Sequence, residues 1–404
     1  MRFATFLIRV LERNAEMSTW LLKNIRPLDV PEFDGSRTVD LLVSDGAVAR
    51  IGQNLKEDNA TTRDFAGAYL SPAWIDVHTH VYWGGSDIAL KPSVIGASTG
   101  VPILVDAGSA GEGNFLGFDE FIIKSAHERI IPFLNVGSIG LVATNRVPEV
   151  RRLQDIDIER VMATVNRHRG LIAGLKMRLC SIIESETDIL PLKLAKKLSR
   201  CLKLPLMTHI GRPLPLVEEV FEHMDKGDIV THCFQGKPAS SVIDDDVVFA
   251  AMLAARERGV ILDIGHGAAS FSYRVARQCL ERGIKPDVIG SDLHNGSLDG
   301  PVWDLSLVLS KLHSLGMTLA ETIAGCASSA RSVLKLPPAD LKAGSAAEFT
   351  LFTTEESALD LPDSNGEVAR INRRICPRAV LWKGELADAA SRMPYGQCDK
   401  GFVQ

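Results

Sequence analysis

The amino-acid sequence predicts a (β/α)8 TIM barrel with a small β-sandwich domain built from both ends of the chain. In the middle of the chain, strand and helix patterns alternate over roughly 260 residues, the usual size of such a barrel. At both flanks, short strand patterns follow one another, and each flank is too small to bury a sheet face alone. We therefore expect a composite sandwich from residues 1–72 and 337–404 and a barrel from residues 73–336.

The composition is that of an ordinary globular protein. The 404 residues are 46% hydrophobic and 24% charged, with a net charge of -5. This charge offers no basic surface for nucleic acid or for an anionic membrane. No apolar run reaches the length of about eighteen residues that a membrane span needs. We expect a small-molecule substrate, no nucleic-acid or membrane partner, and a homo-oligomer.

The cysteines and the first residues bear on the compartment. Seven cysteines are scattered without a Cys-x-x-Cys pair, which favours a reducing compartment over a disulfide framework. Residues 1–16 are basic and mildly apolar but lack a long apolar core and a cleavage site. We interpret them as a helical or frayed N-terminal extension, which lies upstream of the true start if translation begins at Met17. We expect a cytoplasmic protein.

The sandwich strands are short and come in two groups. In the first flank, Asp45-Gly46 is a typical hairpin turn between two of the strand patterns. The predicted strands are residues 20–22, 38–43 and 47–51 at the beginning of the chain, and 348–352, 368–371 and 379–383 near its end.

Eight strand patterns follow in the barrel region. They are residues 73–80, 102–106, 132–136, 172–177, 204–209, 228–232, 260–264 and 288–292. Helical spacing of apolar residues lies between several of them, at residues 118–130, 158–169, 190–202 and 247–258. A doubly wound open sheet is the alternative, but no Gly-x-Gly-x-x-Gly follows the first strand.

Residues of the kinds that bind metals stand at the ends of these strands. His78 and His80 are two apart, so on a strand both side chains point to one face. Four later strands each end on or near one further candidate: Lys176, His209, His232 and Asp292. Because the active site of a TIM barrel lies at the carboxyl ends of its strands, these six side chains predict a metal centre there.

This set of six residues resembles the binuclear metal branch of the amidohydrolase superfamily, which includes dihydroorotase-like amidohydrolases and deacetylases. The resemblance covers the whole chain. It implies that His78, His80 and Asp292 bind one metal ion. It implies that His209 and His232 bind a second ion, and that a carboxylated Lys176 bridges the two.

The chemistry of these residues agrees with that assignment. A lysine buried beside two cations is driven to its neutral form, which is nucleophilic enough to take up carbon dioxide. The donor set suits Zn²⁺ best, although other divalent ions fit too. Two such ions can share a hydroxide that attacks an acyl carbon. Asp292 is then the catalytic residue that takes the proton and passes it to the leaving group.

Four more residues are candidates for binding substrate. Arg178 lies two residues beyond Lys176 and shares its inward face, so it can hold a carboxylate or brace a loop. His266 and His294 follow the last two strands and can line the opening. Tyr82 stands where dihydroorotase-type members carry an arginine that binds the substrate carboxylate, which weakens a dihydroorotase assignment.

The predicted function is metal-dependent hydrolysis of an N-acyl amide or O-acyl ester in a small carboxylate-bearing molecule, most simply deacetylation. One alternative is a cyclic amidase of the dihydroorotase or hydantoinase type. Another is a non-catalytic structural relative, but such relatives generally lose metal ligands, and here all six positions are filled.

Overall fold

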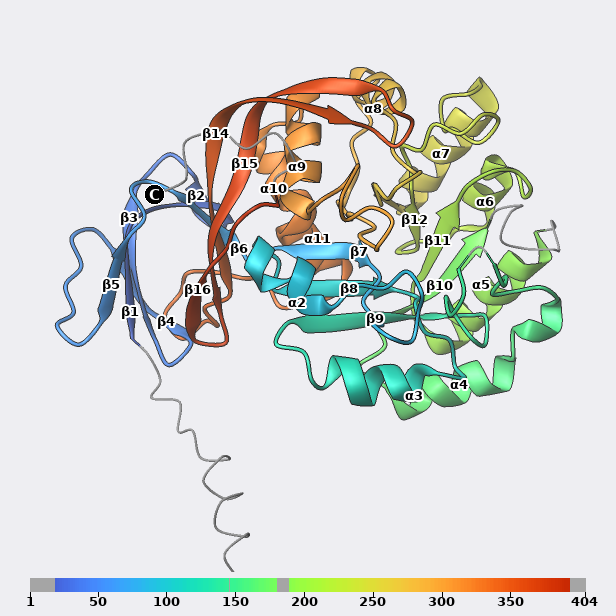
Figure 1. Cartoon of the computed structure of the whole chain (residues 1–404), viewed down its shortest axis with the longest axis horizontal. Helices are drawn as coiled ribbons and strands as arrows, with labels where there is room; N and C mark the ends of the chain where they lie inside the picture. The colour runs from blue at the N-terminus through green and yellow to red at the C-terminus, as the bar shows by residue number, and fades with distance from the viewer. Residues whose placement is uncertain (1–18, 145, 180–188, 393–404) are drawn as a thin grey trace, which may run out of the picture.

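The computed structural model describes residues 19–144, 146–179 and 189–392. The extension predicted at residues 1–16 lies outside the described residues. A parallel barrel occupies the middle of the chain, and a sheet assembled from both chain ends lies beside it (Figure 1). The predicted fold class is confirmed.

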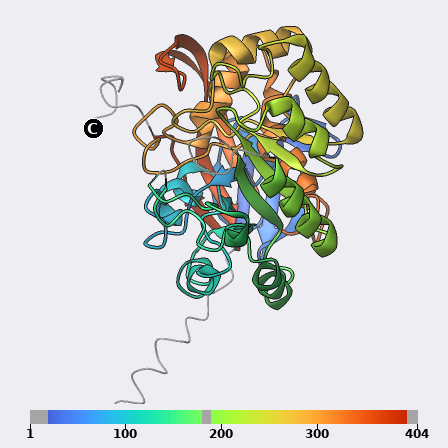
Figure 2. The same ribbon diagram turned by 90° about the vertical axis from the view of Figure 1, so that its right-hand side faces the viewer.

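The barrel strands follow one another in sequence order, each parallel to the next. Figure 2 shows helices around the outside of these strands. Nearly every strand residue is buried, as expected where both faces of a parallel sheet are covered. Within the described residues, the seven strands of this sheet are β7 (Ile75–Thr79), β8 (Ile103–Ala107), β9 (Arg129–Asn135), β10 (Gly174–Leu179), β11 (Leu206–Ile210), β12 (Ile229–Thr231) and β13 (Ile261–Asp263).

The eighth position of the barrel is filled by the chain predicted as a strand at residues 288–292. It is not a regular strand, and the prediction is wrong in this detail. Single parallel bridges join Val288 to Asp263 on one side and Leu293 to Thr79 on the other. The segment therefore nearly closes the barrel between β13 and β7.

Side chains replace the missing ladder bonds of this segment. The Gly290 amide donates to Asp263 Oδ1 at 2.7 Å, and the Ser291 amide donates to Asp76 Oδ1 at 2.9 Å. Two buried carboxylates thus satisfy backbone donors that a regular strand would pair with its neighbour.

Three of the predicted helices are confirmed, with ends shifted by two residues or fewer, as α4 (Ile158–Arg167), α5 (Leu190–Leu202) and α7 (Asp246–Arg258). The helix predicted at residues 118–130 is wrong: after Ile123 the chain leaves the helix, and β9 begins at Arg129. The apolar run from Ile130 onward is buried as a strand. A short apolar run alone does not distinguish a buried strand from a buried helix. The helices are α2 (Pro92–Ile95), η1 (Ala97–Thr99), α3 (Phe115–Phe118), η2 (Asp119–Ile123), η3 (Leu153–Asp155), α4 (Ile158–Arg167), α5 (Leu190–Leu202), α6 (Val217–His223), α7 (Asp246–Arg258), α8 (Tyr273–Glu281), α9 (Leu305–Ser314), α10 (Leu319–Cys326) and α11 (Ser328–Val333).

The second sheet runs in the order β16-β15-β14-β6-β1-β3-β4, with β2 and β5 paired to β1. Leu22 and Leu41 from the first flank share one hydrophobic cluster with Leu351 and Leu381 from the last, as in a sandwich. Its strands are β1 (Trp20–Val30), β2 (Phe33–Asp34), β3 (Val39–Ser44), β4 (Ala47–Gly52), β5 (Thr61–Asp64), β6 (Tyr69–Pro72), β14 (Phe349–Pro362), β15 (Val368–Trp382) and β16 (Glu385–Asp388).

One hairpin of this sheet is much longer than its sequence pattern indicates. The two strands predicted at residues 368–371 and 379–383 are a single strand, β15, and its partner β14 extends to Pro362. Midway along the hairpin, Glu356 and Arg373 face each other across the pair and are exposed. Such polar positions break the apolar alternation that marks a half-buried strand.

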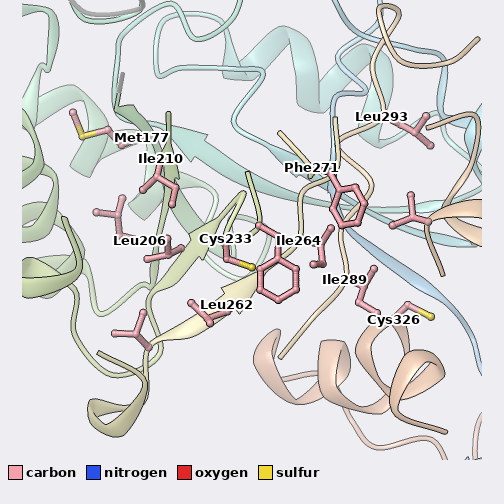
Figure 3. Packing of buried hydrophobic residues seen from close by; sticks show 14 of the residues in the cluster. Met177, Leu206, Ile210, Cys233, Leu262, Ile264, Phe271, Ile289, Leu293 and Cys326 are labelled. Atoms are coloured by element: carbon pink, nitrogen blue, oxygen red, sulfur yellow. The ribbon is translucent and has the colours of Figure 1, made fainter. Parts of the chain in front are cut away.

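The barrel core lies between the strands and the outer helices. Figure 3 shows Leu262, Ile264 and Cys233 in one buried cluster with Ile289 and Cys326. The Ile289 amide donates to the Gly325 carbonyl oxygen at 2.9 Å, which brings the eighth segment against α10. Among the described residues, no helix has the length and apolar character needed to cross a membrane.

Candidate metal centre and active site

One cavity brings the predicted ligands together. It measures about 350 Å³ and lies at the carboxyl ends of the barrel strands, where the fold places active sites. All six predicted ligands line it, together with Arg178 and His294: the ligands are His78, His80, Lys176, His209, His232 and Asp292.

The two histidines at the end of β7 face Asp292. The Nε2 atoms of His78 and His80 lie 3.5 and 3.3 Å from Asp292 Oδ1. Their other ring nitrogens are held by hydroxyl groups: His78 Nδ1 lies 2.8 Å from Thr231 Oγ1, and His80 Nδ1 lies 3.0 Å from Ser109 Oγ. Hydrogen bonds at Nδ1 fix each ring and leave Nε2 directed at the cavity.

The second pair of histidines lies beside the first. The ring centroids of His209 and His232 are 4.4 Å apart, and those of His78 and His232 are 5.1 Å apart. The Nδ1 atom of His232 is held 2.6 Å from the Gly265 carbonyl oxygen. Ligand atoms of His78, His232 and Asp292 all lie within 4.8 Å of one another.

His232 and Asp292 both have a left-handed backbone, with φ of 69° and 51°. Residues other than glycine adopt this conformation at a cost in energy, and they do so chiefly where the surroundings or the function require it. Both residues line the cavity, where ligand atoms of the two lie within 4.8 Å of each other.

Lys176 is buried among the histidines. Its side chain is 1% exposed, and Nζ lies 3.3 Å from His78 Nε2 and 3.4 Å from Met207 Sδ. Burial lowers the pKa of this amine to about 7, so a large neutral fraction exists at neutral pH. Gly108 packs against it, and a Cβ there would stand 2.6 Å from Lys176 Cβ.

The charge state of the cluster suits metal binding. Burial lowers the pKa of His78, His209 and His232 well below its usual value, so these imidazoles are neutral. Burial alone would raise the pKa of Asp292, but the nearby histidines, His78 foremost, hold it well below its ordinary value. Neutral imidazoles beside an ionised carboxylate are the protonation states that metal ligands require.

Two of the four predicted substrate residues reach the cavity wall. Arg178 Nη1 lies 3.0 Å from Oε1 of the buried Glu149, so part of its charge is already balanced within the protein. His294 Nδ1 lies 2.7 Å from the main-chain oxygen of Asp292, which fixes the ring beside the cluster.

The other two do not line the cavity. The Tyr82 hydroxyl donates to the Asn114 carbonyl oxygen at 3.1 Å, and its ring packs on Phe118. His266 is completely buried, with Nε2 only 2.9 Å from Lys311 Nζ. Both side chains have partners outside the cavity, and their contact with substrate stays a prediction.

Several residues of the site were not anticipated. Asp263 accepts from the Thr231 hydroxyl at 2.6 Å and lies 3.3 Å from His78 Nδ1. A buried aspartate ending an apolar strand was the available signal for it. Lys237 and residues 268–270 line the cavity from loops, where no periodic pattern exists to reveal them.

Comparison with known proteins identifies the family. No protein-family model matches the chain. A deacetylase of Brucella anthropi is 43% identical over 377 residues, which cover 93% of this chain and 94% of the relative. A deacetylase of Agrobacterium fabrum is 44% identical over 376 residues, 92% of each protein. The chain belongs to the amidohydrolase superfamily.

Solved structures of this superfamily agree. A crystal structure described as a dihydroorotase has a TM-score of 0.90 at 42% identity, covering 94% of this chain and all of the other. One described as an adenine deaminase has a TM-score of 0.83 at 28% identity, covering 92% of this chain and all of the other. This amidohydrolase is therefore an enzyme, and its homologues act on small-molecule substrates in a superfamily that uses a binuclear metal centre.

Proposed function

We propose that this amidohydrolase is a metal-dependent deacetylase that cleaves an N-acyl amide or O-acyl ester in a small carboxylate-bearing molecule. The observation that carries the proposal is a single cavity of about 350 Å³ lined by six ligand-type side chains and by Arg178. That size suits a compact ligand. The two relatives named deacetylases support the type of reaction.

The donor set fits two divalent ions, most simply Zn²⁺. His78, His80 and Asp292 would hold one, His209 and His232 the other, and Lys176 as its carbamate would join them. When bound, such ions polarise an acyl carbonyl and lower the pKa of water. The neutral imidazoles and the lowered pKa of Lys176, to about 7, support this assignment.

The protein's own groups then supply proton transfer and orientation. Asp292 is ionised, so it can accept the proton of the attacking water and deliver it to the departing amine or alkoxide. Arg178 and His294 lie on the cavity wall, where they can hold the substrate carboxylate. No covalent acyl-enzyme is needed.

A cyclic amidase of the dihydroorotase type is the second candidate, because the solved structure with a TM-score of 0.90 is described as a dihydroorotase. The deciding assay is a panel of acetylated amino acids and hydroxy acids of both hands, run beside dihydroorotate and hydantoins. We expect turnover of acyl acids. Fast turnover of the ring compounds, with none of the acyl acids, would overturn the proposal.

The role of Arg178 is tested with an Arg178→Met, Glu149→Gln double variant, which avoids leaving a buried carboxylate opposite a missing arginine. We expect kcat/KM for acyl acids to fall by about a hundredfold, because a charge-assisted contact is lost. A neutral acyl ester, which does not use the contact, is the control. Equal losses for both substrates would exclude Arg178 from carboxylate binding.

Two further expectations concern the cell. The described cysteines are all free thiols, which supports a reducing compartment such as the cytoplasm.

Leu116 and Phe121 are 59% and 77% exposed on neighbouring turns of α3 and η2, which supports a homo-oligomer. Light scattering of the purified protein measures the second point, and a monomer at all concentrations would contradict it.

A further inference from the structure

The long hairpin of the chain-end sheet reaches the barrel. Figure 1 shows β14 and β15 extending from that sheet across α9 toward α8. The outer half of the hairpin packs on α9, because Leu359, Leu361 and Ile371 form one buried cluster with Leu307. The Ile375 amide also donates to the hydroxyl of Ser310 in α9 at 2.9 Å.

The hairpin tip, residues 363–367, holds the loop that follows β13. The Ser364 hydroxyl donates to the Gly267 carbonyl oxygen at 3.0 Å and accepts from the Phe271 amide at 3.2 Å. The Ser364 amide donates to the Phe271 carbonyl oxygen at 3.1 Å. One residue of the tip therefore fixes both ends of residues 267–271.

Neighbouring contacts extend this attachment to the start of α8. The Tyr273 amide donates to Asp363 Oδ2 at 2.9 Å, and the Tyr273 hydroxyl donates to the Leu361 carbonyl oxygen at 3.1 Å. Arg277 pairs with Glu367 at 2.6 Å.

A buried lysine connects the tip to the same loop. Lys311 Nζ donates to the carbonyl oxygens of Pro301 and Pro362 at 2.7 and 2.8 Å and lies 2.9 Å from His266 Nε2. His266 Nδ1 lies 3.0 Å from the Gly267 carbonyl oxygen. Burial lowers the pKa of Lys311 to about 7; its ammonium form can donate to all three partners, and His266 then donates from Nδ1 to Gly267.

The loop held in this way touches the proposed catalytic carboxylate. Gly267 has φ of +54°, and a Cβ there would stand 2.3 Å from Asp292 Oδ2. Its amide donates to the Ser291 carbonyl oxygen at 2.9 Å, beside Asp292. Residues 268–270, which follow directly, line the cavity.

We infer that Ser364 and Lys311 are positioning residues for the reaction: they hold Gly267 against Asp292 and thereby fix the orientation of its carboxylate. The chain-end domain thus contributes to turnover through its hairpin tip, although none of its residues lines the cavity among those described. The inference rests on the proton-transfer role proposed for Asp292.

The test compares three variants of the full-length, metal-loaded enzyme. Ser364→Ala should lower kcat by about tenfold or more, because small displacements of a reacting group are costly, while KM changes little. Ser364→Thr keeps the hydroxyl and should keep kcat. Arg370→Ala removes a half-exposed ion pair with Asp360 on the hairpin shaft and should match the parent. The assay uses whichever substrate the parent turns over.

Amide hydrogen exchange gives a second readout that does not depend on activity. Residues 267–271 should exchange faster in Ser364→Ala than in the parent, whereas the hairpin shaft should not change. A kcat for Ser364→Ala within about twofold of the parent, or unchanged exchange in this loop, would overturn the inference. If Ser364→Ala is fully active while Asp292→Asn is not, the inference alone fails. If Asp292→Asn is fully active, the proposed function loses its proton carrier.

Discussion

At the scale of single residues, hydrogen bonds hold one ring nitrogen of the ligand histidines so that the other ring nitrogen faces the cavity. Hydroxyl groups of Thr231 and Ser109 fix Nδ1 of His78 and His80. The histidines around Asp292, His78 foremost, hold its pKa well below the ordinary value in spite of burial, so the carboxylate is ionised. The ionised form is the one that can accept a proton from water.

The Asp292→Asn variant tests this role. The amide keeps the shape and one ligand oxygen, so we expect most of the metal to remain bound. Because the amide cannot accept a proton, kcat should fall by about 10²–10⁴-fold. Elemental analysis and steady-state kinetics on the same sample measure both effects, and activity within about tenfold of the parent at neutral pH would exclude Asp292 as the proton carrier.

At the scale of elements, the strands place the ligands, and buried carboxylates tie neighbouring strands together. Asp263 at the end of β13 accepts from Thr231 of β12 and from the Gly290 amide of the eighth segment, and it lies beside His78 of β7. Because one carboxylate contacts three neighbouring segments, it supports both barrel closure and the orientation of a metal ligand.

Asp263→Asn should therefore weaken metal binding. Loss of a partner that orients a ligand typically costs about 10–100-fold in metal affinity. Competition with a chelator measures the change. Asp287→Asn is the matched control, because Asp287 accepts from the Leu262 amide of the same strand at 2.8 Å but contacts no proposed ligand. Equal affinities for the two variants would show that Asp263 has no special role.

At the scale of the whole molecule, the sequence predicted best those positions where a strand pattern ends on a residue type that binds metals. Strand ends carrying His78, His209 or Asp292 could be read in order, because a barrel places all carboxyl ends on one face. Tertiary packing decides which loops line the cavity, such as residues 268–270, and in which direction the Tyr82 side chain points. Neither could be predicted from a local sequence pattern. The long hairpin was missed because its middle is polar on both strands, so no local pattern shows that it reaches the barrel.

Metal binding should also be visible in the stability of the whole fold. Ions that bind only the folded state stabilise it by about 3 kcal/mol at a hundredfold excess over Kd. We therefore expect the Tm of the metal-loaded enzyme to exceed that of the chelator-treated enzyme, and readdition of Zn²⁺ should restore it. Identical melting curves for the two forms would contradict a metal centre inside this barrel.

The central claim is that two ions share the cavity and are joined through Lys176, and the metal content of the parent and of Lys176→Ala tests it most directly. We predict close to two divalent ions per chain in the parent and the loss of at least one in the variant, because only an anion from this strand can join the pair. A short carboxylic acid should partly restore activity to the variant by replacing the carbamate. One ion per chain in both proteins would contradict the account.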